Sequence, residues 1–549
     1  MGSFSGNSAE TQKLKRFGFV TTNSISQVFQ RRVMEAHLNA KKPLSLTMAI
    51  PDHPWTKVTR DSAAVRIAMT VAQAGKHEGR LMEVVSEEAV ETDSPVILFA
   101  EKQGKINSDL TVGADVTGAK ELKANASISS PGVKLHGAGF IVSPEEAVHL
   151  GLGKLPDLER YIRIYRNGRD LMDRPRGVMV IDMFGLGSDE IRSRFPAIYQ
   201  HLHMTVKAPR DKQVADAENP TKDAISYAEN WWLFGKPRSE LRPALARLPR
   251  YIATVETAKH RVFQFLDASI LPDNMVIAFA LTDAHSLGVL SSQTHRTWVA
   301  YNAASMGVYI GDVRYSKSRC FDPFPFPDAT EIQKASIGAI AEELDAHRKR
   351  VLEEHPHLTL TGLYNVLERL KAGARPDELN EKERRIFDDG LVLIIKELHE
   401  RLDAAVADAY GWPVDLAEEE VLARLVALNK ERAKEEKRGL VRWLRPDYQI
   451  PRFGSEKEKA EQIEADFGEA AVAKAGPKPS FPTDERDQTP AVLHQLMEAE
   501  GPIDAAAIAS SFKQGRKCLG AVQAVLNALS RMGLVSTADG KRFAWRRVA

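Results

Sequence analysis

The sequence predicts a multidomain chain that combines α/β and α+β folds with a helical region and a C-terminal unit of helices and a hairpin. Its 549 residues are enough for three or four domains. Short apolar runs typical of strands surround an amphipathic segment near the N-terminus, whereas residues 331–449 carry helical periodicity. A stretch punctuated by Gly and Pro separates these two regions.

Composition places the chain among soluble globular proteins, at 43% apolar and 27% charged residues. No apolar run approaches the roughly 18 residues that a membrane span needs, and the N-terminus has no apolar signal region. Cys320 and Cys518 cannot form a disulfide framework or a Cys-rich zinc site. We expect a cytoplasmic protein with no membrane partner. The net charge of +1 restricts any nucleic-acid surface to a local patch.

The first predicted domain, residues 1–95, alternates strands with a helix. The expected elements are a strand, a helix with Ser24 as its N-cap, and two further strands, at 17–22, 24–38, 44–50 and 63–74. Residues 96–330 form a mixed second domain. The third, residues 331–449, is expected to be helical, with helices at 339–354, 387–410 and 417–444.

A polar linker is expected at 450–488, followed by a winged-helix-like domain at 489–549. The predicted order is three helices, at 490–500, 505–512 and 519–533, and then a hairpin around Asp539–Gly540. Basic residues dominate its second half, where Asp539 is the single acid. Five of them are candidate DNA contacts: Lys513, Arg516, Lys517, Lys541 and Arg542. A winged-helix domain that binds DNA inserts a helix into the major groove and contacts the DNA backbone with its wing. Some winged helices bind proteins instead.

Several unusual segments occur in the order found in one enzyme family. They are FGFVTTNSISQ followed by a helix, a strand and PDHPW (17–55), the runs at 161–185, 227–261, 288–299 and 315–328, GLYNVLERL (362–370) and GLVRWLRPDYQ (439–449). Over residues 16–452 the chain resembles the large MmeI-like and phage-defence adenine-N6 DNA methyltransferases. The resemblance implies that residues 1–95 are the C-terminal part of a Rossmann-like catalytic domain, and that residues 96–330 recognise the DNA target.

Members of this family bind S-adenosylmethionine through a Gly-rich turn and catalyse through an Asn/Asp-Pro-Pro-aromatic loop, both upstream of the position of Phe17. The sequence contains no Pro-Pro dipeptide, and the run from Asp322 to Phe326 has a Phe between its prolines. HGAGF (136–140) and FGLGSD (184–189) are lone glycine clusters. We therefore expect no cofactor on this chain alone. A separate N-terminal half would supply both sites and would cover the exposed edge of strand 17–22; a truncated gene product is the alternative.

Two residues are candidates for the pocket of the target base. In the resemblance, Trp55 occupies the loop that holds an aromatic ring against a flipped base; the alternative is a Trp packed on the sheet. Asn23 follows the first strand, where it would orient the substrate or cap the next helix.

Basic residues in the second domain are candidate phosphate or base contacts. The alternative for each is a solvated surface charge. They are Lys236, Arg238, Arg242, Lys259, Arg261, Arg296, Arg314, Lys317 and Arg319.

Hydrolytic and metal chemistry are not favoured. Ser291, Ser292 and His295 lie close in sequence, but no Gly-x-Ser-x-Gly elbow is present. His53, His285 and His295 have no metal-ligand spacing, so no metal site is expected.

The leading hypothesis is therefore the target-recognition part of a site-specific adenine-N6 DNA methyltransferase from a restriction–modification or phage-defence system, with double-stranded DNA as its partner. Two alternatives remain. One is a DNA-binding specificity subunit without catalysis. The other is an inactive relic or a scaffold for other defence proteins.

Overall fold

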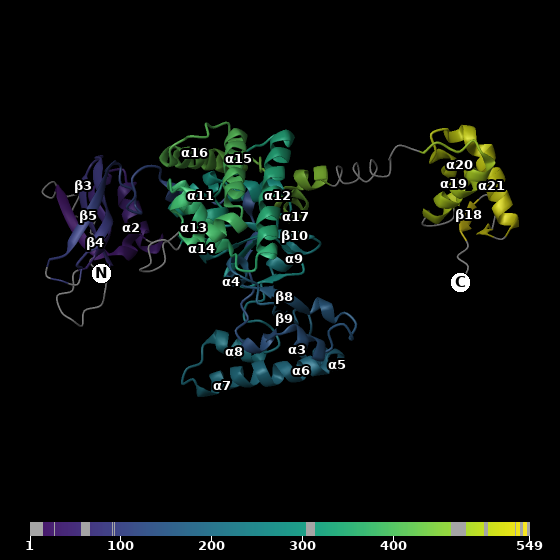
Figure 1. The fold of residues 1–549 in the computed structure, drawn as a ribbon, viewed down its shortest axis with the longest axis horizontal. Coiled ribbons are helices and arrows are strands. Elements are labelled where there is room, and N and C mark those ends of the chain that lie inside the picture. Colours follow the sequence, from purple (N-terminus) through teal and green to yellow (C-terminus); the bar gives the residue numbers. More distant parts are fainter. Residues whose placement is uncertain are drawn as a thin grey trace. The chain divides into compact units, whose positions relative to one another are not determined.

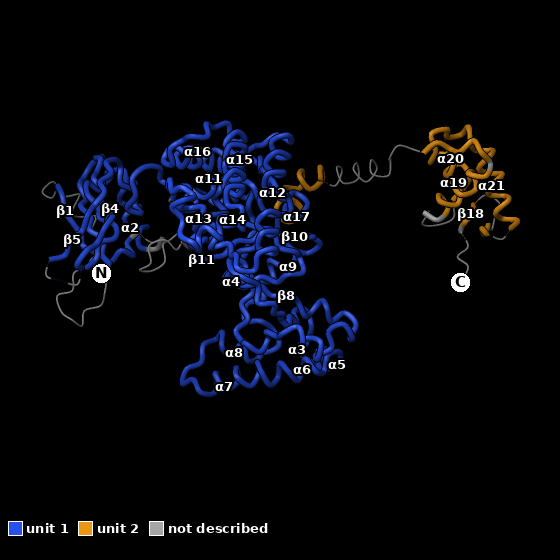
Figure 2. Tube along the Cα trace, in the orientation of Figure 1, with its two compact units in different colours: residues 1–449 blue, residues 450–549 orange. Residues whose placement is uncertain are grey.

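The computed structural model describes residues 15–26, 28–55, 66–90, 92, 94–302, 313–462, 479–498, 503–532, 534–537 and 542–545. They belong to two compact units, residues 1–449 and 450–549 (Figure 2). Among the helices in these ranges, none is long and apolar enough to cross a membrane.

The N-terminal lobe, residues 16–104, is a five-stranded sheet with one helix packed on it (Figure 1). Its elements are β1 Arg16–Thr22, η1 Asn23–Ser26, α2 Val28–Leu38, β2 Leu44–Pro54, β3 Arg66–Ala74, β4 Gly79–Glu88 and β5 Val96–Gly104. The strand order is β1-β3-β2-β4-β5, and only β2 and β4 run parallel. Met34 of α2 shares a buried cluster with Leu46 and Ala72.

The predicted strands at 17–22, 44–50 and 63–74 correspond to β1, β2 and β3, with β3 between the other two. The helix predicted from residue 24 begins later, because Asn23–Ser26 form a 3-10 turn and α2 starts at Val28. The β4–β5 hairpin, whose strands leave Val85 and Leu98 exposed, was not predicted.

The central lobe joins an antiparallel sheet, in the order β12-β10-β14-β6, to a helical layer. Its strands are β6 Ser129–Pro131, β10 Arg250–Val255, β12 Gln264–Asp267 and β14 Val276–Phe279, with a separate ribbon of β11 Thr257–Ala258 and β15 Val313–Arg314. Its helices are η2 Val116–Gly118, η3 Lys123–Asn125, α4 Gly168–Met172, α9 Leu241–Leu245, α10 Ala284–Ser291, α11 Gln293–Asn302, η7 Lys317–Phe321, α12 Glu331–Glu354, α13 Leu360–Lys371, η8 Pro376–Glu378, α14 Glu381–Asp389, α15 Val392–Tyr410 and α16 Glu418–Lys437.

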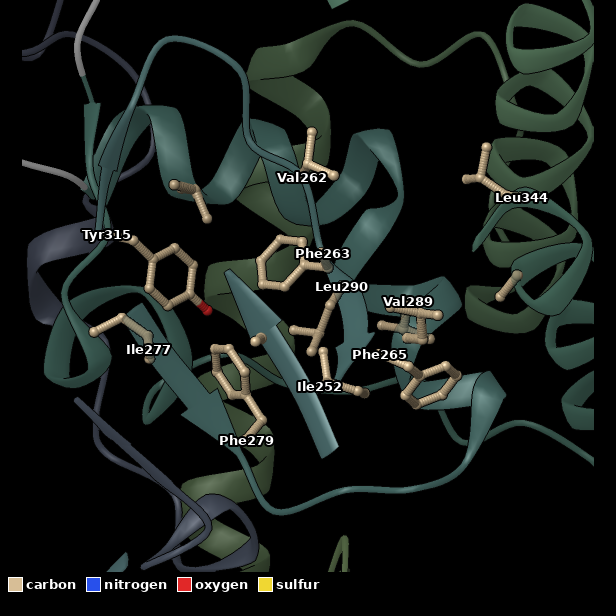
Figure 3. Close-up of a cluster of buried hydrophobic side chains, with 14 of the residues drawn as sticks. Ile252, Val262, Phe263, Phe265, Ile277, Phe279, Val289, Leu290, Tyr315 and Leu344 are labelled. Carbon is tan, nitrogen blue, oxygen red and sulfur yellow. The ribbon is translucent and has the colours of Figure 1, made fainter. Parts of the chain in front are cut away.

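Aromatic side chains fill the space between this sheet and its helices (Figure 3). The ring of Phe279 on β14 lies 5.9 Å from those of Phe263 and Tyr315 and 4.9 Å from that of Phe321. All four residues are fully buried. Because the same core continues into α10, α12 and α15, the sheet and the helical region form one body rather than two domains.

The insert lobe, residues 133–240, has its own core around a sheet in the order β13-β8-β9-β7. Its strands are β7 Ile141–Val142, β8 Ile162–Arg166, β9 Met179–Ile181 and, contributed by the central lobe, β13 Leu271–Pro272. Its helices are η4 Ala138–Phe140, α3 Pro144–His149, η5 Leu158–Arg160, α5 Ser188–Arg194, α6 Pro196–Leu202, the π-helical turn η6 His203–Lys207, α7 Ala208–Asp216 and α8 Lys222–Glu229.

Two of the long helices differ from the prediction in where they are interrupted or end. The helix predicted at 387–410 is interrupted, because Leu391 adopts a left-handed backbone conformation (φ 45°) between α14 and α15. A Cβ at the adjoining Gly390 would lie 2.1 Å from Leu363, so α13 packs directly against the break. The helix predicted to reach residue 444 ends at Lys437, just before Gly439 with its φ of 90°.

The described part of the C-terminal unit includes helices α19, α20 and α21 and a three-stranded antiparallel sheet, β16-β18-β17. Its elements are α19 Glu485–Glu498, β16 Ile503–Asp504, α20 Ala505–Ser510, η9 Gly515–Cys518, α21 Leu519–Arg531, β17 Val535–Ser536 and β18 Arg542–Trp545. Helix α17 Pro446–Phe453 and the start of α19 extend into the range predicted as a linker. The Asp539–Gly540 turn lies outside the described residues.

A buried histidine makes the stability of the central lobe depend on pH. His295 on α11 lies 3.1 Å from the hydroxyl of Tyr315, and burial together with the charge of Arg261 lowers its pKa to about 3. The unfolded chain protonates this histidine near its ordinary pKa of about 6.5, whereas the folded chain does not. We expect His295 to lower the free energy of unfolding by about 2 kcal/mol between about pH 6.5 and about pH 5, and to contribute nothing at higher pH.

The measurement is urea unfolding as a function of pH for the natural protein and for His295→Gln. The variant should lose about that much of the pH dependence in the acidic range. Identical pH profiles for the two proteins would contradict the assignment.

Candidate nucleic-acid interface

The two candidate base-pocket residues follow the C-terminal ends of β1 and β2, on either side of β3 in the N-terminal lobe. The amide of Asn23, directly after β1, donates to Asp52 Oδ1 at 3.1 Å. Asp52 also pairs with Arg66, at 2.7 Å. Trp55 follows β2 and keeps 46% of its surface exposed, so its ring is not part of the sheet core. The structure therefore joins Asn23 to the segment that leads into Trp55.

The charges of Arg31 on α2 and Arg314 on β15 act on Arg319 of η7. We call these three residues the arginine cluster. Burial, and then the charges of Arg31 and Arg314, lower the pKa of Arg319. Arg314 pairs with Glu256 at 2.6 Å. The Nε of Arg31 is buried without a hydrogen-bond partner in the described part of the chain. Positive charge thus accumulates at this junction, which suits binding to phosphates.

The sequence predicts Arg314 and Arg319 of the cluster as DNA contacts but not Arg31. The Arg31–Arg32 dipeptide is too short to be a basic motif, and the approach of Arg31 to Arg319 depends on packing between lobes.

The guanidinium of Arg242 is paired with other groups of the same chain and is not a free surface charge. Its guanidinium makes a two-pronged ion pair with Asp182, at 2.7 and 2.9 Å, and its Nε donates to the carbonyl of Pro237. Arg238, in a left-handed backbone conformation, donates to the carbonyl of Gly132 at 3.0 Å. The side chain of Arg242, which is 20% exposed, thus has internal partners, and its contact with a phosphate stays a prediction.

Arg261 and Arg296 are also turned inward. Arg261 is half-buried, donates to the carbonyl of Val255, and lies over the ring of Tyr315 at 5.2 Å. Burial lowers its pKa. Arg296 is 19% exposed and faces Asp403 on α15 at 3.5 Å. We therefore leave both out of the proposed interface.

Two lysines of the central lobe are exposed but paired. Lys259 contacts Glu368 at 2.7 Å and Asn365 at 3.0 Å. Lys317 pairs with Asp322 at 3.2 Å. The Lys259–Glu368 pair lies at the surface, contributes little to stability and opens readily toward a phosphate. Asp322, the partner of Lys317, is buried instead.

Lys236 lies elsewhere, in the insert lobe. It is exposed at the rim of a pocket, and its backbone pairs with that of Lys134.

Basic side chains of the C-terminal unit gather just before α21. Lys513, Arg516 and Lys517 are exposed, and none of them forms an ion pair within the part of this unit that the structure describes. Arg542 is exposed on β18. Lys541 lies outside the described residues.

The glycine cluster HGAGF and the proline run are explained by packing. A Cβ at Gly139 of HGAGF would lie 2.2 Å from Thr205, so this glycine permits close contact with the π-helical turn. The segment that contains Pro323 is fixed by Asn125, whose amide donates to the carbonyls of Phe321 and Phe324 at 2.8 Å. Among the described residues, no three His, Cys, Asp or Glu side chains form a metal site.

Comparison with known proteins agrees with this architecture. Residues 119–328 match the family described as MmeI, target recognition domain. DNA methyltransferase A of Bacillus subtilis (strain 168) is 30% identical over 165 residues, which are 30% of this chain and 15% of that protein. The structure of the Type IIL restriction–modification enzyme MmeI in complex with DNA matches with a TM-score of 0.54 and 19% identity, covering 76% of this chain and 50% of that one.

The chain thus spans half of the MmeI structure and a smaller share of the Bacillus relative. The family match covers the insert lobe and the central sheet, with β15 and η7 near its end. Residues 119–328 are therefore an MmeI-type target recognition domain, and the chain that contains them is MmeI-like.

Proposed function

We propose that this chain recognises a short duplex DNA sequence for a site-specific adenine-N6 DNA methyltransferase of a bacterial, cytoplasmic restriction–modification or phage-defence system. The match of residues 119–328 to a target recognition domain is the observation that carries the proposal. The arginine cluster supports it, because cations grouped at the edge of that domain attract the DNA backbone.

The methyl donor of such enzymes is S-adenosylmethionine, and the described residues do not fit it. Of the two glycine clusters, HGAGF packs against the turn at Thr205, and FGLGSD leads into the seven-residue helix α5. We propose that a complementary methyltransferase segment, in the same polypeptide or in another, holds the donor and the Asn/Asp-Pro-Pro-aromatic loop. The outer edge of β1, where Val20 is 57% exposed, is the place where its sheet would continue.

In this scheme, the residues of this chain position DNA. The arginine cluster holds backbone phosphates while the recognition domain reads the groove. Trp55 offers a ring face to the extruded adenine, which compensates for lost stacking. Asn23, fixed by Asp52, orients the target strand beside it.

The C-terminal unit adds a second contact. Its order of helices and strands is that of a winged helix, and Lys513, Arg516 and Lys517 lie exposed before α21. We propose that α21 or its preceding turn touches the DNA backbone.

The experiment is binding of the purified chain to random duplex DNA across a salt series, followed by sequencing of the bound fraction. We expect enrichment of one short motif and an affinity that falls with salt. Binding without enrichment would contradict sequence recognition and leave backbone contact alone.

The alternatives give different results with the same protein. A specificity subunit would enrich a motif but gain no methylation when a complementary methyltransferase segment is added. A relic or a scaffold for other defence proteins, for which the helices of residues 331–449 offer a surface, would bind no duplex at moderate salt.

A further inference from the structure

A pocket of about 570 Å³ in the insert lobe lies outside the arginine cluster. It is lined by residues of HGAGF (136–140), of FGKPR (234–238), of the π-helical turn η6 and of α8. The rings of His136 and Tyr227 stack in its wall, with centroids 4.7 Å apart. Gly235 allows this arrangement, because a Cβ there would lie 2.3 Å from the ring of His136.

Two lysines face each other at the rim of this pocket. Lys134 and Lys236 exchange both backbone hydrogen bonds, each 3.0 Å long, so they are a directly opposed pair on adjacent chain segments. Like charges in this arrangement repel each other. Neither lysine has an ion-pair partner among the residues that the structure describes, so the repulsion is not relieved within the chain.

A third cation lies beneath them. Arg210 on α7 is 5% exposed, and its guanidinium donates to five backbone carbonyls, among them those of His136 at 3.0 Å and Leu135 at 3.0 Å. No carboxylate pairs with it in the described part of the lobe. Burial lowers its pKa to about 10, so it remains charged at neutral pH. Asp223 is the single acid among the lining residues.

The backbone around the pocket is unusual in two places. His136 has a φ of 51°, which is costly for a residue with a side chain. Residues His203–Lys207 form a π-helical turn that brings Thr205 into the wall. Both features concentrate at functional sites more than elsewhere.

We propose that this pocket binds a phosphate group of the DNA backbone through Lys134 and Lys236, above the buried charge of Arg210. This second contact of the recognition domain rests on the proposed function. A backbone phosphate here carries one negative charge, which would offset the repulsion between the opposed lysines, and its oxygens would accept hydrogen bonds from both ammonium groups. Because phosphates carry no sequence information, the site strengthens binding without selecting bases.

The test compares the natural protein with K134Q/K236Q and with the control K154Q/R160Q, which removes two exposed charges from the same lobe. Duplex binding is measured across a salt series, with one selected and one scrambled duplex. We expect K134Q/K236Q to lower the magnitude of the logarithmic salt slope by about one, since the two lysines hold a single phosphate, and to lower the affinity roughly 10-fold at moderate salt. Both duplexes should lose affinity equally, and the enriched motif should stay the same.

The outcomes separate this inference from the proposed function. If the natural protein enriches a motif but K134Q/K236Q has an unchanged salt slope, the assignment of the pocket as a phosphate site is wrong and the proposed function stands. No duplex binding by the natural protein overturns both. Calorimetric titration with dAMP distinguishes the source of the phosphate. If dAMP binds the natural protein tightly and one-to-one, and K134Q/K236Q loses this binding but still binds DNA, the ligand of the pocket is a free nucleotide and not the DNA backbone.

Discussion

Replacing Arg242 with alanine is expected to lower the free energy of unfolding by about 3–5 kcal/mol, since it leaves a buried carboxylate without its partner. Asp182 is 4% exposed, and both of its oxygens accept from the Arg242 guanidinium. The guanidinium also lies 4.2 Å from the ring centre of Phe184. Since Asp182 follows β9 of the insert lobe and Arg242 belongs to α9, the loss should appear where the two lobes join.

The measurement is urea unfolding followed by the fluorescence of Trp231 and Trp232 in the insert lobe. The matched control is the double variant R242M/D182L, which removes both charges and should recover most of the lost stability, because an apolar pair replaces a buried ion pair at little cost. Under conditions in which Arg242→Ala is folded, its salt slope for DNA should equal that of the natural protein. A reduced slope without loss of stability would return Arg242 to the DNA interface.

The contrast between Arg242 and Arg319 shows what the sequence could predict. Strands β1, β2 and β3 were predictable because alternation and turn residues are local signals. The positions of the basic residues could also be predicted, but the groups with which they pair could not. Asp182, whose carboxylate pairs with Arg242, lies 60 residues away in the sequence. Arg31 comes near Arg319 only because the two lobes pack together. A single sequence does not tell an internal ion pair from a free surface charge.

The break between α14 and α15 has a similar origin. The apolar pattern at 387–410 continues through Gly390 and Leu391, so periodicity predicts one helix. The interruption depends on the tight approach of Leu363 from α13 to Gly390. The pocket of the insert lobe could not be predicted either, because its lysines come from segments about one hundred residues apart.

Removing the arginine cluster is expected to cause the largest loss of DNA affinity. The variant R31Q/R314Q/R319Q should bind duplex DNA roughly 100-fold more weakly at moderate salt, with a salt slope reduced in magnitude by up to about three. These side chains have few internal partners to compensate the loss: Glu256 neutralises Arg314, while Arg31 and Arg319 form no ion pair among the described residues. The measurement is fluorescence anisotropy of a labelled duplex across a salt series.

The control is R375Q/R384Q/R385Q, which removes the same charge from exposed positions at α14 and its preceding turn. A general effect of net charge would weaken binding equally in both variants, whereas a local interface weakens it only when the cluster is removed. Because R314Q removes the partner of Glu256, urea unfolding of the cluster variant shows that it is folded under the binding conditions. Equal affinities of the two variants would place the DNA elsewhere on this chain and would separate the recognition domain from the junction with α2.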